Sequence, residues 1–298
     1  MFSKDFKIDF IGIGAPRSGT TWLSSVLSEH PEICFSKTKE LDFFNAEHFY
    51  WAKNWTQKYK KLGFKWYESQ FSHFKKKQKR GEYSVFYIFD KEAPRMIKEF
   101  FPDVKLILSF RNPTEAVYSH YLYHRLDLDL PDFEKMLTKK HPFLKYGFYS
   151  GYLENYYKYF DRNSIMIILY DEIKNNPELL IRKLYRFLDV NDEFTPNCIN
   201  EVINPVGVKQ AIEAKMYFNI RNKIRKKIRE GLGRFPFVKK NLVKIDNIMK
   251  KILFKTGKRK KVTLEIPLNI RMKLDKIYRE EINKLEKLIN RDLLIWKK

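Results

Sequence analysis

The chain has 298 residues, 44% hydrophobic and 16% aromatic, a composition that excludes a disordered or low-complexity protein. Its formal net charge of +23 indicates either a solvated basic surface or anionic partners, such as nucleotide phosphates, acidic glycans, anionic lipid or nucleic acid. Cys34 and Cys198, far apart in sequence, make neither a disulfide framework nor a zinc pattern. We find no signal-peptide pattern and no stretch of roughly 18 apolar residues that could span a bilayer, so we expect a cytoplasmic protein.

Strands and helices are predicted to alternate over the first 200 residues. In chain order these are a strand over 7–14, a helix over 20–28, a short strand over 32–35, an aromatic-rich helix over 46–62, an extended segment from 81, a helix over 92–101, a strand over 104–110, helices over 113–125 and 149–159, a strand over 164–170 and a helix over 177–188. The strands over 104–110 and 164–170 are continuous apolar runs, as parallel strands covered on both faces require. This pattern predicts an α/β fold with a central parallel sheet flanked by helices.

The last third of the chain is predicted to be helical. Basic helices are expected over 210–230 and 237–254, and an amphipathic helix over 267–294. The segment 219–261 holds 17 lysines and arginines against two acidic residues, so +15 of the net charge lies there. We expect one domain over 1–298, with a core over about 7–200 and a basic helical extension over about 205–298.

A glycine-rich loop follows the first predicted strand. The run Gly14-Ala-Pro-Arg-Ser-Gly-Thr-Thr21 has the frame of a phosphate-binding P-loop, except that Thr20 stands where the lysine belongs. Backbone N–H groups around Arg17–Thr21 can converge on a 5′-phosphate at the N-terminus of the following helix. Asp171, after the strand over 164–170, is a weak candidate for the second Mg²⁺ ligand that phosphate-chain chemistry requires. The loop therefore suits a nucleotide with one 5′-phosphate and a different group beyond it.

A second motif follows the strand over 104–110. Arg111 comes directly after this strand, where ligands bind in open α/β sheets, and its planar fork can grip a phosphate with two hydrogen bonds. Ser119 lies about two helical turns further on and can face the same phosphate.

The two motifs resemble those of the 3′-phosphoadenosine 5′-phosphosulfate (PAPS)-dependent sulfotransferase family. The run APRSGTTWLSSVLSEHPEI, from residue 15, is similar to its 5′-phosphosulfate loop, and VKLILSFRNPTEAVYSH, from residue 104, to its 3′-phosphate segment. The segments 81–84, 146–153 and 290–296 resemble further family motifs, of the bacterial and glycan-modifying branches. The resemblance covers about residues 8–200 and the last thirty.

This resemblance implies a fold, an activity and a set of site residues. The fold is like that of P-loop kinases, and the activity is in-line transfer of the sulfuryl group of PAPS to a hydroxyl or amine of a glycan, lipid or small molecule. No metal is required. The residues that match the donor-binding positions are Arg17, Ser18, Gly19, Thr20, Thr21, Trp22, Arg111 and Ser119.

The resemblance also suggests the catalytic base. Glu40, shortly after the phosphate loop and its helix, matches the glutamate base of glycan-type enzymes, and Lys39 or Lys37 would help to neutralise the sulfuryl group together with Arg17. Partial burial, with Phe43 and Phe44 as an apolar wall, would raise the pKa of such a base toward neutrality.

Two other bases stay open. Glu82 lies in a Gly-Glu-Tyr-Ser segment, where Tyr83 replaces a lysine that glycan-type enzymes use near the acceptor, so the acceptor class is also open. His120 is the third candidate. It lies one helical turn from His124, but without a completing Glu or Cys the pair favours a packed or cleft-lining role over a metal site.

Two rival functions share these features. A small-molecule kinase would use the same scaffold but needs Mg²⁺ and a loop lysine, against which Thr20 argues. A non-catalytic protein would bind an anionic surface through 219–261, where Ile220, Ile224 and Ile228 recur at helical spacing beside basic residues. This pattern permits peripheral association with the inner membrane surface. No zinc-finger or RNA-recognition signature supports nucleic-acid binding.

Overall fold

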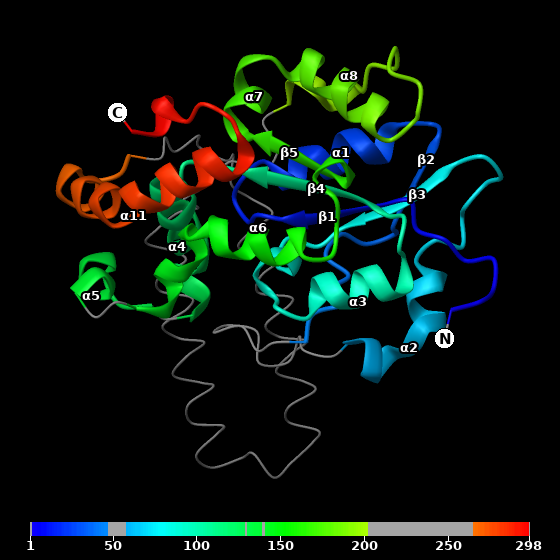
Figure 1. Cartoon of the computed structure of the whole chain (residues 1–298), viewed down its shortest axis with the longest axis horizontal. Coiled ribbons are helices and arrows are strands. Elements are labelled where there is room, and N and C mark those ends of the chain that lie inside the picture. The colour runs from blue at the N-terminus through cyan, green and yellow to red at the C-terminus, as the bar shows by residue number, and fades with distance from the viewer. Residues whose placement is uncertain (1, 47–57, 129, 139–140, 202–264, 298) are drawn as a thin grey trace, which may run out of the picture. The chain divides into compact units, whose positions relative to one another are not determined.

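A five-stranded parallel sheet of order β2–β3–β1–β4–β5 organises the computed structural model, which describes residues 2–46, 58–128, 130–138, 141–201 and 265–297 (Figure 1). The strands are β1 Phe10–Gly14, β2 Ile33–Phe35, β3 Lys79–Tyr83, β4 Lys105–Phe110 and β5 Ile165–Leu169. Each neighbouring pair is parallel. The predicted parallel α/β fold is therefore confirmed, and every predicted strand overlaps an observed one.

Helices cover both faces of this sheet, with α1 and α8 on one face and α3 and α6 on the other (Figure 1). The α-helices are α1 Thr20–Glu29, α2 Lys58–Ser69, α3 Ala93–Phe100, α4 Pro113–Leu128, α5 Phe133–Thr138, α6 Tyr149–Tyr157, α7 Tyr170–Asn175, α8 Pro177–Phe187 and α11 Leu268–Ile289. Short 3₁₀ helices are η1 Tyr87–Phe89, η2 Pro142–Gly147, η3 Arg162–Ser164, η4 Asn197–Asn200 and η5 Leu294–Trp296. In the described ranges, no helix is long and apolar enough to cross a membrane.

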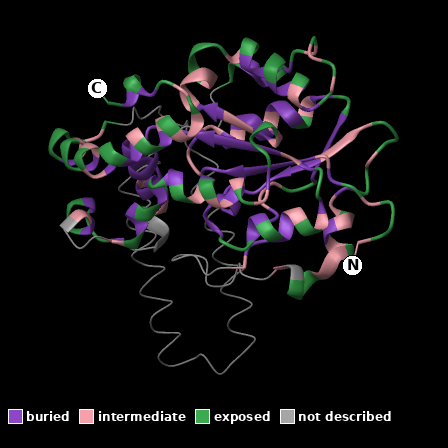
Figure 2. Ribbon diagram, viewed as in Figure 1, coloured by how far each residue is buried: buried purple, intermediate pink, exposed green. Residues whose placement is uncertain are grey.

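The strands are buried because helices pack on both sides of them, as Figure 2 shows. All five residues of β1 and the last five of β4 are buried, which explains their continuous apolar runs. Pro113 begins α4 as predicted, and the side chain of Asn112 caps it by accepting a hydrogen bond from the amide of Thr114 at 3.0 Å.

Two compact units make up the chain. The first comprises 1–120, 134–204 and 266–298 and contains the sheet. The second comprises 121–133 and 205–265, and among its described residues the Tyr121 hydroxyl donates to the carbonyl of Pro131 at 3.1 Å. The predicted helices over 210–230 and 237–254, and most of the one over 46–62, lie outside the described residues. The single domain over 1–298 stays a prediction.

The order of the strands fixes where a ligand can bind. After β1 the chain builds β2 and β3 on one side, and β4 and β5 then extend the sheet on the other side. In open α/β sheets such a reversal leaves a crevice at the carboxyl ends of the strands on either side of it. Here these strands are β1 and β4, which pair directly, so the loops that follow them lie side by side.

Gly12, in the middle of β1, has no room for a side chain. A Cβ atom there would lie 2.2 Å from the ring of Tyr83, which is fully buried against the strand. We therefore predict that Gly12→Ala lowers the free energy of unfolding by about 2–3 kcal/mol, the typical cost of overpacking a core. Urea denaturation measures this change.

Gly151, on the exposed side of α6, provides the matched control. A Cβ atom at Gly151 meets nothing within 4 Å, so Gly151→Ala should be neutral or stabilise the helix by about 0.5–1 kcal/mol. Equal losses in the two variants would contradict the close packing of β1 against Tyr83.

Candidate active site

The loop between β1 and α1 presents an uncapped helix N-terminus. Gly19 is the N-cap residue, with φ of 83°, and no side chain caps the first turn of α1, which also contains no acidic residue. The free N–H groups and the helix dipole make this end of α1 a site for an anion. A Cβ atom at Gly19 would lie 2.4 Å from Cδ1 of Ile173, so the loop can lie this close to α7 only with glycine there.

Neighbouring β4 braces the same loop. The amide of Ala15 donates to the carbonyl of Ser109 at 2.8 Å, and the Ser109 hydroxyl donates to the carbonyl of Ser18. Ser18 and Thr20 are buried, whereas Arg17 and Thr21 are half-buried. The loop is therefore held to the sheet by two hydrogen bonds.

The two predicted phosphate-binding motifs meet at this loop. The Arg17 Nε donates to the hydroxyl of Ser119 at 3.0 Å, and Nη1 of Arg111 lies 3.4 Å from the carbonyl oxygen of Arg17. Motifs about a hundred residues apart in sequence are brought together because β1 and β4 are adjacent. Two guanidinium groups and a helix N-terminus concentrate positive charge here, which favours an anion with more than one charged group.

Three residues that sequence reasoning missed surround Arg111. The carboxylate of Glu115 accepts from its Nε at 3.0 Å and from Nη2 at 2.7 Å, and the ring of Tyr170 lies 4.6 Å away. Arg271 of α11 approaches the other oxygen of Glu115, at 3.9 Å. The i,i+4 spacing of Arg111 and Glu115, and the position of Tyr170 directly after β5, are the signals that could have identified two of them.

Trp22 is one of the buried residues of the predicted donor site. Its side chain is buried, and its indole N–H donates to the carbonyl of Ile199 in η4 at 3.1 Å. The tryptophan therefore joins α1 to the segment that follows α8, and its contact with a nucleotide stays a prediction.

The C-terminal segment crosses the same edge of the sheet. Trp296 makes two hydrogen bonds there. Its backbone carbonyl accepts from the side chain of Asn112 at 3.2 Å, and the Trp296 indole N–H donates to Asp171 at 2.8 Å. Arg291 forms an ion pair with Glu172 at 3.0 Å. These contacts fix the residues directly after β4 and β5.

Glu40 and Lys39 form an ion pair near the phosphate loop. The distance from the lysine Nζ to Oε1 of Glu40 is 2.6 Å, and about a third of the Glu40 side chain is exposed. Tyr83 contacts both this pair and the loop. The Nζ of Lys39 lies 5.9 Å from the centre of the Tyr83 ring, and the Tyr83 hydroxyl donates to the carbonyl of Gly14 at 3.0 Å. Lys37 is instead hydrogen-bonded to Ser72.

Phe43 and Phe44 are entirely buried. The ring centroid of Phe43 lies 4.7 Å from that of Tyr67, and that of Phe44 lies 5.8 Å from that of Tyr87. The two phenylalanines thus fix the residues that follow Glu40 in a buried aromatic cluster.

Glu82 is completely buried and accepts three hydrogen bonds. The hydroxyls of Tyr67 and Tyr87 donate to its Oε1, each at 3.0 Å, and the hydroxyl of Ser84 donates to its Oε2 at 2.6 Å. Burial raises the pKa of Glu82 to about 7, against the opposing effect of these hydroxyls. An acceptor could not reach this carboxylate, so its surroundings favour a structural role over that of a base.

A second buried carboxyl belongs to Asp42. Burial, together with the nearby charges of Glu40 and Glu82, raises its pKa to about 7, although Lys58 at 3.6 Å opposes the shift. Asp42 is thus a second buried carboxyl near Glu40.

His120 is packed in the protein interior. Its ring is stacked on that of Phe143, at 4.8 Å between centroids, and the rings of Phe86 and Tyr146 lie near it. This environment favours the packed role that the sequence suggested over that of a base. Within the described ranges, no three His, Cys, Asp or Glu side chains gather as metal ligands would.

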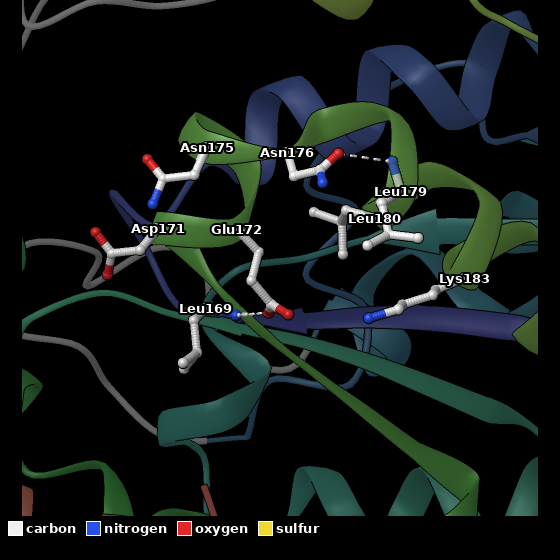
Figure 3. A pocket seen from close by; sticks show the side chains of 8 residues that line it. All are labelled: Leu169, Asp171, Glu172, Asn175, Asn176, Leu179, Leu180 and Lys183. Carbon is white, nitrogen blue, oxygen red and sulfur yellow. Dashed lines mark hydrogen bonds between the residues drawn. The ribbon is translucent and has the colours of Figure 1, made fainter. Parts of the chain in front are cut away.

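A separate pocket of about 200 Å³ lies beside α7 and α8 (Figure 3). It is lined by Leu169, Asp171, Glu172, Asn175, Asn176, Leu179, Leu180 and Lys183. Hydrogen bonds from the amide of Leu169 to Glu172 and from the amide of Leu179 to Asn176 border it. No residue of the phosphate loop lines this pocket, so it does not form the predicted donor site.

The fold and the site together define a P-loop-kinase-like protein with a phosphate loop that lacks the lysine. A family model described as "Sulfotransferase domain" matches residues 7–285, and the chain belongs to this sulfotransferase family of enzymes. The family predicted from the two sequence motifs is thereby confirmed.

Individual relatives agree with this assignment. The chain is 31% identical over 144 residues to "Membrane-associated sulfotransferase kil1" of Dictyostelium discoideum, a match that covers 47% of this chain and 26% of the relative. It is 26% identical over 212 residues to "Bifunctional heparan sulfate N-deacetylase/N-sulfotransferase 4" of Mus musculus, a match that covers 62% of this chain and 22% of the relative. The matched region thus spans about a quarter of the length of these relatives.

The fold is also that of a solved sulfotransferase. The crystal structure of a sulfotransferase from Alicyclobacillus acidocaldarius matches with a TM-score of 0.68 and 22% identity, over 98% of this chain and 100% of that one. This likeness confirms the predicted P-loop-kinase-like fold.

The raised pKa of Glu82 gives a prediction for stability. Because this pKa rises from 4.5 in the unfolded chain to about 7 in the folded one, the contribution of Glu82 to stability is fully present below pH 4.5 and is lost as the pH rises through 7. The difference in unfolding free energy between the wild type and Glu82→Gln should fall by about 2 kcal/mol from pH 5 to pH 8. Urea denaturation at several pH values measures this difference.

Glu154→Gln, at an exposed position of α6, is the control and should follow the wild type at every pH. If the curves of the wild type and Glu82→Gln stayed parallel from pH 5 to pH 8, Glu82 would not titrate as a buried carboxyl.

Proposed function

We propose that this chain transfers the sulfuryl group of PAPS to a hydroxyl or amine of a glycan. The observation that carries the proposal is the meeting of Arg17, Arg111 and Ser119 at the uncapped N-terminus of α1. One phosphate group would bind at the N-terminus of α1, and a second would bind to Arg111 and Ser119 beside it. A 3′-phosphate is the group that distinguishes PAPS from ATP.

In this proposal the loop binds the 5′ end of the donor. The N–H groups of residues 17–21 and the hydroxyls of Thr20 and Thr21 would contact the phosphosulfate, while Arg111 and Ser119 would hold the 3′-phosphate. Glu115 accepts hydrogen bonds from Nε and Nη2 of Arg111. These bonds fix the orientation of the guanidinium group that would bind the oxyanion. No metal is needed for this arrangement of charges.

Glu40 is the proposed base. As the acceptor oxygen or nitrogen forms its bond to sulfur, its proton passes to the Glu40 carboxylate, and the bond from sulfur to the 5′-phosphate oxygen breaks in line. Negative charge then grows on the leaving phosphate, where the loop N–H groups and Arg17 can stabilise it. Lys39, whose Nζ lies 2.6 Å from Oε1 of Glu40, would help to neutralise the sulfuryl group as it is transferred.

The acceptor class is inferred from charge and from the relatives. The name of the mouse relative states that it acts on heparan sulfate, an acidic glycan, and a chain with a net charge of +23 would attract such an acceptor. The basic segment 219–261 lies outside the described residues. Its contact with an anionic acceptor or a membrane surface stays a prediction from its charge.

The donor site is tested by calorimetric titration with 3′-phosphoadenosine 5′-phosphate, the desulfated product. We expect binding that is independent of Mg²⁺ and at least about 30-fold weaker in Arg111→Ala, since a charge-assisted hydrogen-bonded pair contributes roughly 2 kcal/mol or more. Arg95→Ala removes an exposed arginine of α3 and should bind like the wild type.

A preference for ATP–Mg²⁺ over this product would overturn the proposal and favour a small-molecule kinase. If Arg111→Ala bound this product as tightly as the wild type, Arg111 would not bind the 3′-phosphate.

The catalytic base is tested by Glu40→Gln, with transfer of radiolabelled sulfate from PAPS to N-desulfated heparan sulfate as the assay. We expect loss of turnover by at least about 100-fold, in line with general-base catalysis, and product affinity within about twofold of the wild type. Glu154→Gln is the carboxylate control.

If Glu40→Gln turned over normally, Glu40 would not be the base. If the wild type transferred sulfate to a lipid or a small phenol but not to the glycan, the acceptor class would be wrong while the donor site remained.

A further inference from the structure

We infer that Glu82 is a positioning residue, which holds the loop that carries Glu40 by orienting two buried hydroxyl groups. The catalytic part of this inference rests on the proposed role of Glu40 as the base. The structural part rests on the hydrogen bonds that connect the end of β3 and η1 to residues 40–44.

The loop is held mainly through its backbone amides. The amide of Asp42 donates to the hydroxyl of Ser84 at 3.0 Å, and the amide of Phe43 donates to the hydroxyl of Tyr87 at 2.8 Å. The amide of Glu40 itself donates to the carbonyl of Tyr83 at 3.0 Å. Three successive anchors thus come from one segment, residues 83–87.

Two of these anchors depend on Glu82. A hydroxyl has one proton to donate, and Ser84 and Tyr87 both direct theirs to the Glu82 carboxylate, at 2.6 and 3.0 Å. Their lone pairs then remain available for the loop amides. Each oxygen of the Glu82 carboxyl group accepts one of these hydroxyl protons, so Glu82 fixes both hydroxyls in the orientation that the loop requires.

The loop needs such anchors because its backbone is strained. Glu40 and Asp42 adopt positive φ angles of 63° and 49°, which residues other than glycine rarely take without external support. Asp42, Phe43 and Glu82 are all buried, so water cannot substitute for a lost hydrogen bond. A change at the anchor would therefore be transmitted to the side chain of Glu40.

Tyr67 provides a matched control for this relay. Like Tyr87, it is fully buried and donates its hydroxyl to Oε1 of Glu82 at 3.0 Å. Unlike Tyr87, it does not hold the loop amides of Asp42, Phe43 and Phe44, which donate instead to the hydroxyls of Ser84 and Tyr87. Tyr67→Phe and Tyr87→Phe therefore remove the same bond to Glu82, and only Tyr87→Phe removes an anchor of the loop.

The experiment compares these two variants by amide hydrogen exchange and by kinetics. In Tyr87→Phe we expect exchange in the peptide covering residues 38–46 to become at least about tenfold faster, because a lost anchor lowers the local opening free energy. We also expect kcat for sulfate transfer to N-desulfated heparan sulfate to fall at least about tenfold, with affinity for 3′-phosphoadenosine 5′-phosphate within about twofold. Tyr67→Phe should leave all three close to the wild type.

Ser84→Ala is the second loop variant, for use if Tyr87→Phe fails to fold, and it should accelerate exchange at Asp42 in the same way. If the amides of residues 38–46 exchanged equally fast in Tyr67→Phe and in Tyr87→Phe or Ser84→Ala, the hydroxyls of Tyr87 and Ser84 would not anchor the loop. Faster exchange with unchanged kcat would overturn its catalytic role. If Glu40→Gln were fully active, the base assignment would fail, while the exchange result would still decide the anchor independently.

Discussion

The direct pairing of β1 with β4 is the constraint on which the site depends. Parallel pairing puts the carboxyl ends of both strands at one edge, so the loop after β1 and Arg111 after β4 must lie together. The bonds between Ala15, Ser109 and Ser18 then lock the loop to β4. Arg17 and Ser119 meet because of this arrangement, and neither motif could form the site alone.

The opposite side of the site is built on the pairing of β1 with β3. Tyr83 packs on Gly12 and reaches Gly14, while the segment that follows it holds the loop of Glu40. One strand, β1, therefore separates two groups of residues with different tasks. The group next to β4 contains the guanidinium groups of Arg17 and Arg111, whereas the group next to β3 is rich in buried carboxyls and hydroxyls.

Local sequence patterns predicted much of this structure because they depend on near neighbours. Continuous apolar runs identified β4 and β5, and the structure brings Arg111 and Ser119, which the sequence singled out, into contact with Arg17 of the loop after β1. The surroundings of Glu82 could not be predicted in this way, since the local sequence does not show that the hydroxyls of two tyrosines and a serine enclose its carboxylate. That enclosure depends on tertiary packing of α2 and η1 against β3, which local patterns do not contain.

Helix ends show the same limit. The amphipathic helix predicted over 267–294 ends at Ile289, because Asn290 takes a left-handed conformation and the chain turns back toward the sheet. The pattern of apolar residues continued beyond this point because Leu293 and Trp296 are buried as well. Burial alone therefore cannot distinguish a helix from the segment that follows it.

The position of Trp296 has a consequence for how the protein is made. Its hydrogen bonds with Asn112 and Asp171 join it to loops synthesised more than a hundred residues earlier. A nascent chain on the ribosome could form the sheet while both loops still lacked these contacts. The loops after β4 and β5 would then gain these two contacts only after residue 296 had emerged.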